Sequence, residues 1–284
     1  MRNKDNFAFF ILTNGRPDNV RTYGSLRRSG YTGKVFFIVD NEDPTADEYR
    51  KNFGPENVIV FDKAAIAKTF DEADTIKDRR SIVYARNASF GIAKELGLDY
   101  FCQLDDDYTN FSYRYIRGDI VTSHTIRNFN DVIPVMLDLL EDTGALTVAF
   151  SQGGDHFGGL EGNISKVYKR KAMNSFFVRT DRPINFVGRI NEDVNAYVVD
   201  GARGELFFTV MNIQLSQVAT QKSSGGMTEN YLDSGTYLKS FFTVMMAPSC
   251  VRIRLMGRTD MRLHHSIQWN KAVPKIISDQ YRKP

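Results

Sequence analysis

The chain has 284 residues, of which 42% are hydrophobic and 25% are charged. This balance supports a sizeable buried core and excludes long disordered regions. The formal net charge is only +3, so the total charge neither indicates nor excludes a nucleic-acid partner.

The cysteines and the N-terminus indicate the compartment in which we expect the protein to work. Cys102 lies in an apolar run and Cys250 lies beside another, which favours two reduced core thiols over a disulfide. Residues 1–5 lack the apolar core of a signal peptide, and no apolar stretch approaches the roughly 20 residues of a membrane span. We therefore expect a cytoplasmic protein with no membrane association.

The first half of the chain alternates short apolar runs with segments of helical periodicity. In chain order we expect a strand at 7–12, a helix at 18–29, a strand at 35–39, a helix at 45–52, a strand at 58–61, a helix at 79–96 and a strand at 100–104. Asp18 is the expected N-cap of the first helix, and Gly97 the expected C-cap of the third. This alternation predicts an α/β fold with a mainly parallel sheet, which binds ligands beyond the carboxyl ends of its strands.

The second half of the chain is less regular. We expect a helix at 131–141 and strands at 145–150, 175–178, 206–211 and 241–246. Glycine-rich segments at 152–163 and 222–226 are expected to be flexible loops. No repeat or linker divides the chain, so we expect a single domain, residues 1–284, with a nucleotide-binding half at 1–107 and an acceptor half at 108–284.

Three adjacent carboxylates, Asp105, Asp106 and Asp107, follow the strand at 100–104 directly. Such neighbours repel one another unless a cation or strong hydrogen-bond donors offset their charge. Mg²⁺ and Mn²⁺ commonly bind one or two carboxylates together with phosphate oxygens. The triplet therefore indicates a metal site that also holds a diphosphate, although a solvated acidic turn has the same pattern and phosphatases use similar clusters.

Other residues near the carboxyl edge are candidates for contacts with a nucleotide. In the loop after the first strand these are Thr13, Asn14, Gly15 and Arg16, which an ordinary strand-to-helix turn could equally contain. Asp40 ends the second strand, where a carboxylate can accept hydrogen bonds from a base or ribose. Arg86 and Asn87 are candidates to face a bound donor, whereas Arg79 and Arg80 are expected to be solvated.

Three segments of the chain resemble the GT-A glycosyltransferases: ILTNGRP (11–17), YARN (84–87) and LDDDY (104–108). A later Asn-Glu-Asp (191–193) resembles the motif that supplies the catalytic base in many inverting members. Within that superfamily, LDDDY together with MNSFFVRTDRPINFVGRINEDV (173–194) is most similar to the TET-associated glycosyltransferase group of phages.

This resemblance implies a GT-A (Rossmann-like) fold, with a mixed, mainly parallel sheet flanked by helices, and a metal-dependent sugar transfer. The implied donor is a UDP-sugar, bound through Mn²⁺ or Mg²⁺. Asp105 and Asp107 would bind the metal, and Asp105 and Asp106 would lie at the diphosphate. The implied acceptor is 5-hydroxymethylpyrimidine in double-stranded phage DNA, modified in the host cytoplasm.

The resemblance also implies a general base, Asp193, with Glu192 beside it. An acceptor hydroxyl is a poor nucleophile, and a carboxylate within hydrogen-bond reach can take its proton as the anomeric carbon is attacked. A helix N-terminus enriched in acids would show the same pattern. GT-A enzymes often take a third metal ligand from a late histidine, a position that His264 and His265 fit, although paired surface histidines without a metal are also common.

Basic and aromatic segments are candidates for contacts with DNA. Residues 108–117 interleave four aromatic side chains with Arg114 and Arg117, and aromatics stack on bases while arginines contact phosphates. Further basic residues are Lys166, Lys169, Arg170, Lys171, Arg179, Arg182, Arg252, Arg254, Arg258 and Arg262. Each cluster is also compatible with a solvated face. A target base inside a duplex would have to be flipped out, which the loop at 152–163 could assist.

Three alternatives remain open from the sequence alone. A GT-A enzyme can act on a glycan, a lipid or a protein instead of DNA. Sugar nucleotidyltransferases share the nucleotide-binding sheet, but they usually carry a lysine in the loop after the first strand, and TNGRPDN (13–19) has none. A DNA-binding module without enzymatic activity would give no reason for the acidic triplet.

Overall fold

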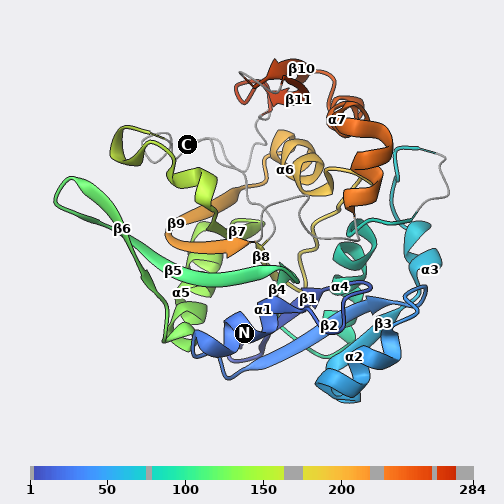
Figure 1. Ribbon diagram of the computed structural model, residues 1–284, viewed down its shortest axis with the longest axis vertical. Helices are drawn as coiled ribbons and strands as arrows, with labels where there is room; N and C mark the ends of the chain where they lie inside the picture. Colours follow the sequence, from blue (N-terminus) through green and yellow to red (C-terminus); the bar gives the residue numbers. More distant parts are fainter. Residues whose placement is uncertain (1–2, 75–78, 163–174, 218–226, 258–260, 273–284) are drawn as a thin grey trace, which may run out of the picture.

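The computed structural model describes residues 3–74, 79–162, 175–217, 227–257 and 261–272. Within them, nine strands form a central sheet in the order β3-β2-β1-β4-β8-β7-β9-β5-β6 (Figure 1). The first four in that order are parallel to one another: β1 (Phe7–Leu12), β2 (Lys34–Asp40), β3 (Val58–Phe61) and β4 (Tyr100–Asp105). Their carboxyl ends therefore meet at one edge of the sheet.

The other five strands make the sheet mixed. They are β5 (Tyr108–Arg117), β6 (Ile120–Thr125), β7 (Thr147–Ser151), β8 (Ser175–Arg179) and β9 (Phe207–Gln217). β8 is antiparallel to β4 and β7, β7 is parallel to β9, and β5 is antiparallel to both β9 and β6. β5 and β6 form a long hairpin that extends away from the body of the protein (Figure 1). The predicted mixed sheet flanked by helices is confirmed.

Helices cover both faces of this sheet. They are α1 (Arg21–Arg28), α2 (Ala46–Phe53), α3 (Lys63–Ala67), α4 (Val83–Glu95), α5 (Phe129–Thr143), α6 (Glu192–Ala202) and α7 (Met227–Met246). Two further strands, β10 (Val251–Met256) and β11 (Arg262–Ile267), form a separate antiparallel pair beside α7. No helix in the described part of the chain has the length and apolar character that crossing a membrane requires.

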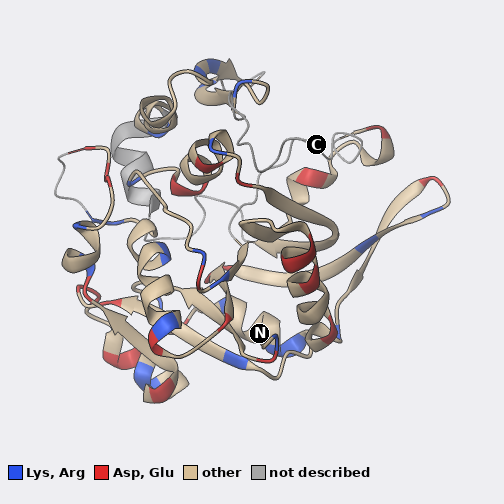
Figure 2. Ribbon diagram, turned by 180° about the vertical axis from the view of Figure 1, so that it is seen from behind, with Lys and Arg blue, Asp and Glu red and all other residues tan. Residues whose placement is uncertain are grey.

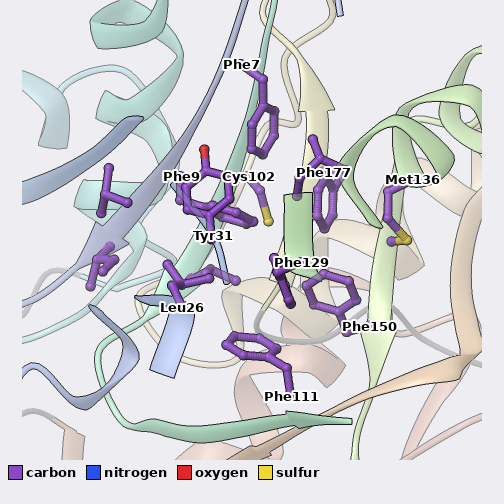
Figure 3. Packing of buried hydrophobic residues seen from close by; sticks show 14 of the residues in the cluster. Phe7, Phe9, Leu26, Tyr31, Cys102, Phe111, Phe129, Met136, Phe150 and Phe177 are labelled. Atoms are coloured by element: carbon purple, nitrogen blue, oxygen red, sulfur yellow. The ribbon is translucent and has the colours of Figure 1, made fainter. Parts of the chain in front are cut away.

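The unbroken apolar run of β1 reflects burial on both faces of the sheet. Phe7 and Phe9 belong to a core cluster that includes residues of α1 and α5, and Figure 3 shows them close to Tyr31, Cys102 and Phe177. The alternate β1 residues pack on the other side, in a cluster that includes α4. A period of two along the strand thus divides its side chains between two cores. The two clusters thus pack against opposite faces of the strands at whose carboxyl ends the predicted site lies.

The first helix starts later than the sequence predicts. Asp18 is not its N-cap, because α1 begins at Arg21 and Val20 occupies the N-cap position without a side-chain cap. Instead, the backbone N–H of Thr22 donates a hydrogen bond to the carbonyl oxygen of Asp106 at 3.1 Å. A tertiary contact with the acidic triplet therefore satisfies a backbone donor that a side-chain cap would otherwise serve. The C-cap of α4 is Leu96, one residue before the predicted Gly97, and Gly97 follows it in the left-handed conformation at φ +65°.

The strand predicted at 241–246 is wrong, because these residues form the end of α7. A short apolar run does not by itself distinguish a buried strand from a buried helix. The loop predicted at 152–163 contains two short 3₁₀ helices, Gly153–His156 and Gly159–Glu161. The loop predicted at 222–226, and residue 163 of the first loop, lie outside the described residues.

Asp200 in α6 generates a prediction for stability. The residue is buried, and this burial raises the pKa of its carboxyl group to about 6, although Arg203 opposes the shift. An aspartate in an unfolded chain has a pKa of about 3.9, so the folded state loses stability relative to the unfolded one as the pH rises from about 4 to about 6, and the loss is complete above that range. We expect Asp200→Asn to raise the Tm at pH 8 and to change it much less at pH 4, as measured by circular dichroism. An equal gain at both pH values would contradict this account.

Candidate active site

A cavity of about 450 Å³ opens at the carboxyl edge of the parallel strands. Its apolar wall includes Leu12 from β1, Ile38 from β2 and Phe61 from β3. Several residues that the sequence predicts for the site form its polar wall, namely Thr13, Asn14, Arg16, Asp40, Asp105, Asp106 and Asp107. The fold therefore gathers side chains that lie up to about ninety residues apart in the sequence, such as Arg16 and Asp106, around one space.

Asp106 joins the loop after β1 to the acidic triplet. Its Oδ2 accepts a hydrogen bond from Thr13 Oγ1 at 2.8 Å, and its Oδ1 accepts one from Arg16 Nη1 at 3.1 Å. Burial raises the pKa of Asp106, while the charge of Arg16 and the hydrogen bonds oppose this shift. Because the protein engages both carboxylate oxygens, Asp106 serves as an anchor, and the other two aspartates are better placed to bind a ligand.

Asp40, at the end of β2, lies between two hydrogen-bond donors. Its Oδ2 accepts from Asn14 Nδ2 at 2.8 Å and from Lys63 Nζ at 3.2 Å. Lys63 is buried, it also borders the cavity, and sequence reasoning misses it. Its position two residues after the third parallel strand is the signal that could have identified it. Together, the carboxylate and the ammonium group offer an acceptor and a donor to the polar edge of a nucleobase.

The segment just before α4 adds another cation to the cavity. Arg80 borders it together with Ser81, whereas the sequence analysis expects Arg79 and Arg80 to be merely solvated. That expectation misses the role of Arg80, whose side chain is exposed and yet forms part of the cavity wall. Arg79 pairs instead with Glu42 at 3.5 Å.

Two predicted residues shape loops and do not border the cavity. Gly15 has a φ of +66°, which glycine adopts without strain, and its N–H donates to Asp43 Oδ2 at 2.7 Å. Asn87 on α4 donates to the carbonyl oxygen of Phe186 at 2.9 Å and accepts from its N–H at 3.2 Å. Asn87 thus fixes the segment that leads toward α6.

Arg86 is the most deeply buried cation of the site, with a side chain only 1% exposed. Its Nη2 donates to Asp105 Oδ1 at 3.1 Å, and its Nε donates to Glu192 Oε1 at 2.9 Å. Burial raises the pKa of Asp105 to about 7, with the Arg86 charge opposing and the Asp107 charge adding to the shift. Burial also raises the pKa of Glu192, again opposed by Arg86. The structure therefore places Arg86 between two carboxylates. Arg86 does not line the cavity, as a residue in contact with a bound sugar donor would.

Asp105 and Asp107 have the chemistry that a divalent cation requires. In the described part of the chain, Asp107 forms no ion pair, and burial and the neighbouring charge of Asp106 raise its pKa. A hard cation bound by oxygen ligands would offset this crowded negative charge. Among the described residues, no three His, Cys, Asp or Glu side chains form a ready-made metal cage. The two aspartates thus fit a metal that takes its remaining ligands from phosphate and water.

The predicted histidine ligands lie on β11, next to the start of α6. His265 is buried, and its Nδ1 lies 3.3 Å from Asn191 Nδ2, while the rings of His264 and His265 stack at 4.4 Å. The described structure does not bring either ring into a metal cluster with Asp105. Their role as metal ligands stays a prediction.

Asp193 and Glu192 occupy the first turn of α6, where the helix dipole favours negative charge. Asn191 precedes them in the left-handed conformation, with a φ of +58°, and it donates through Nδ2 to the carbonyl oxygen of Lys239 on α7 at 2.7 Å. Asp193 Oδ1 accepts from the N–H of Val194 at 2.7 Å. Since Glu192 is paired with Arg86, Asp193 is the carboxylate of this pair that is not bound to that guanidinium.

The aromatic segment predicted to bind DNA divides between core and surface. Tyr108 and Phe111 are fully buried, so these two rings cannot stack on nucleobases. Their place at the start of β5 explains the difference: a register shift between Tyr108 and Asn110 allows both rings to be buried, whereas the end of β5 extends away from the body of the protein in the hairpin. Tyr115 is 44% exposed and Arg117 is exposed, so both stay candidates. Arg114 donates a hydrogen bond to Gln214 on β9.

The predicted basic clusters are only partly described. Arg252, Arg254 and Arg262 are exposed on β10 and β11, whereas Arg179 and Arg182 pair with Asp181 and Glu205. Lys166, Lys169, Arg170, Lys171 and Arg258 lie outside the described residues. In Figure 2, basic and acidic residues of the described chain are interspersed along the helices and the hairpin. The charge in this part of the chain therefore does not by itself mark a surface for DNA.

Comparison with protein families assigns the chain to the glycosyltransferases. Residues 7–226 match the family described as TET-Associated Glycosyltransferase. The chain therefore belongs to the TET-associated glycosyltransferase family, as its resemblance in sequence predicts. No curated protein matches the chain in a sequence search.

Solved structures with a similar fold include several sugar transferases. One is glucosyl-3-phosphoglycerate synthase from Mycobacterium tuberculosis in complex with Mg²⁺ and UDP, with 9% identity, a TM-score of 0.46, and coverage of 92% of this chain and 87% of that one. Another is the mannosyltransferase PcManGT from Pyrobaculum calidifontis in complex with GDP-Man and Mn²⁺, with 9% identity, a TM-score of 0.47, and coverage of 77% and 58%.

If Asp105 and Asp107 bind a metal, a direct prediction follows for Asp107→Ala. We expect this change to abolish Mn²⁺-dependent binding of UDP, because it removes a carboxylate that forms no ion pair within the described part of the chain and is therefore available to a cation. The Tm should not fall, since one of three mutually repelling carboxylates is lost. Isothermal titration calorimetry and thermal melts would measure the two effects. Asp119→Ala, at the exposed turn of the β5–β6 hairpin, is the control and should bind normally. Unchanged UDP binding by Asp107→Ala would refute the metal assignment.

Proposed function

We propose that this protein transfers a sugar from a UDP-sugar to the hydroxyl group of a hydroxymethylated pyrimidine in DNA, in a metal-dependent reaction. The observation that carries this proposal is the pair Asp105 and Asp107 at the end of a buried strand, bordering a cavity of about 450 Å³. Membership of the glycosyltransferase family makes a nucleotide sugar the natural occupant of that cavity.

The cavity offers complementary groups for each part of the donor. Asp40 and Lys63 would bind the polar edge of the base, and the apolar residues of β1 to β3 would contact its faces. Arg16 and Arg80 add positive charge near the triplet, where the diphosphate would lie. A bound Mn²⁺ or Mg²⁺, held by the aspartates, would offset the negative charge that grows on the departing diphosphate.

Asp193 is the residue that we propose as general base. As the acceptor oxygen attacks the anomeric carbon, the bond from that carbon to the diphosphate breaks, and the hydroxyl proton passes to the Asp193 carboxylate. Glu192 is less suited to this task because Arg86 engages it at 2.9 Å. The nucleoside diphosphate leaves with the electron pair of the broken bond.

The DNA acceptor rests on the family and on a few exposed side chains. The family name associates these transferases with TET enzymes. Exposed Tyr115 and Arg117 on the hairpin could contact a nucleotide chain that approaches the site along β5. A base in a duplex would have to leave the stack to reach the donor.

The decisive experiment measures UDP release in the presence of Mn²⁺, a UDP-sugar and DNA that contains 5-hydroxymethylcytosine. We expect turnover that requires the hydroxymethyl group, and we expect DNA binding to weaken steeply as salt concentration rises. Unmodified DNA of the same sequence is the control. No turnover across a panel of nucleotide sugars and modified DNAs, together with negligible DNA binding, would favour a glycan, lipid or protein acceptor.

The base assignment makes a separate prediction for Asp193→Asn. An amide cannot take the proton, so we expect the rate of sugar transfer to fall by at least about 100-fold. Donor binding should be nearly unchanged, because Asp193 does not border the cavity that would hold the donor. The pair of measurements is the transfer rate under saturating donor and the dissociation constant of UDP with Mn²⁺. A fully active Asp193→Asn variant would show that another group accepts the proton.

A further inference from the structure

Arg86 connects two segments that the proposed function uses for different tasks. It lies in the first turn of α4, and its guanidinium contacts Asp105 at the end of β4 and Glu192 at the start of α6. Glu192 is 106 residues away in the sequence. Only the fold brings the metal carboxylate and the base motif to the same cation.

The surroundings of Arg86 hold this cation in one orientation. The rings of Phe176 and Phe186 lie 5.0 and 5.7 Å from its guanidinium carbon. The side chain of Gln103, on β4, donates to the carbonyl oxygen of Arg86 at 2.9 Å. A planar guanidinium presents donors at fixed angles, so the two carboxylates it binds are also fixed relative to each other.

We infer that Arg86 is a positioning residue, which couples the orientation and charge of Asp105 at the donor metal to Glu192 in the base motif. This inference rests on the proposed function, because it assumes that Asp105 binds the donor metal. Together, the guanidinium of Arg86 and the carboxylates of Asp105 and Glu192 carry a formal charge of −1. Glu192 contributes to this charge although it is not itself a metal ligand. Through Arg86, its negative charge strengthens the binding of the metal at Asp105, whereas Asp193 acts on the acceptor.

A lysine at position 86 could not replace this function. Its single ammonium group is a point charge without the fixed fork of a guanidinium, so it would not hold both carboxylates in the same relative orientation. Arg86→Lys therefore preserves the positive charge but no longer fixes the carboxylates of Asp105 and Glu192 relative to each other. Glu192→Gln does the opposite, because the amide oxygen can still accept from Nε while the negative charge is lost.

The test is a double-mutant cycle on the dissociation constant of Mn²⁺, measured by calorimetry at saturating UDP for the wild type, Arg86→Lys, Glu192→Gln and the double variant. We expect Glu192→Gln to weaken Mn²⁺ binding about fivefold and Arg86→Lys to weaken it about tenfold or more. In the Arg86→Lys background, Glu192→Gln should have a clearly smaller effect, because the group that transmits it is gone. Asp200→Asn is the matched control, since it converts another buried carboxylate of α6 to an amide and should leave Mn²⁺ binding unchanged.

The possible outcomes distinguish a failure of the coupling through Arg86 from a failure of the proposed function. Additive effects of the two changes, or unchanged Mn²⁺ affinity in Glu192→Gln, would overturn the inference and leave the donor site in place. A wild-type protein that does not bind Mn²⁺ with UDP would overturn the proposed function as well. If Arg86→Lys unfolds, as a thermal melt would show, the comparison of Glu192→Gln with Asp200→Asn still decides: equal affinities would overturn the coupling.

Discussion

Carboxylates crowded at the end of a buried strand repel one another, and the surrounding structure offsets this repulsion unevenly. Asp106 accepts hydrogen bonds from Thr13 and Arg16, which fix its side chain within the protein. Asp105 shares the buried Arg86 with a second carboxylate. Asp107 forms no ion pair with the described chain. The remaining negative charge is therefore concentrated where the cavity opens, which is the arrangement that a divalent cation can complete.

The sheet topology explains how the two halves of the site meet. β4 and β5 are separated only by the turn at residues 106–107, so the chain leaves the parallel part of the sheet directly at the triplet. β8 then pairs antiparallel to β4, and the chain after it leads into α6. Glu192 reaches Arg86 because of this return path. The site thus lies where the sheet changes from parallel to mixed, and helices from both halves of the chain contribute to it.

Much of the parallel half of the sheet can be predicted from the local sequence pattern, because strands that are buried on both faces are unbroken apolar runs and their ends carry polar residues. The runs at 7–12 and 100–104 predict β1 and β4 well, and the triplet is at the predicted edge. Local pattern fails where tertiary contacts decide. The apolar run at 241–246 suits a helix as well as a strand, and only packing against neighbouring elements selects α7. The position of Lys63 after β3 indicates the right edge of the sheet, but only the fold shows that this lysine is buried against Asp40.

The sequence by itself determined the class of fold, the place of the acidic triplet and the resemblance to a glycosyltransferase family, since these depend on periodicity and on contiguous motifs. The tertiary structure decided which residues are neighbours across long separations. It assigned Arg86 to carboxylates and not to the cavity wall, placed Tyr108 in the core, and brought Lys63 to Asp40. The physical reason is that burial and charge pairing depend on distances in space, and a one-dimensional pattern does not contain those distances.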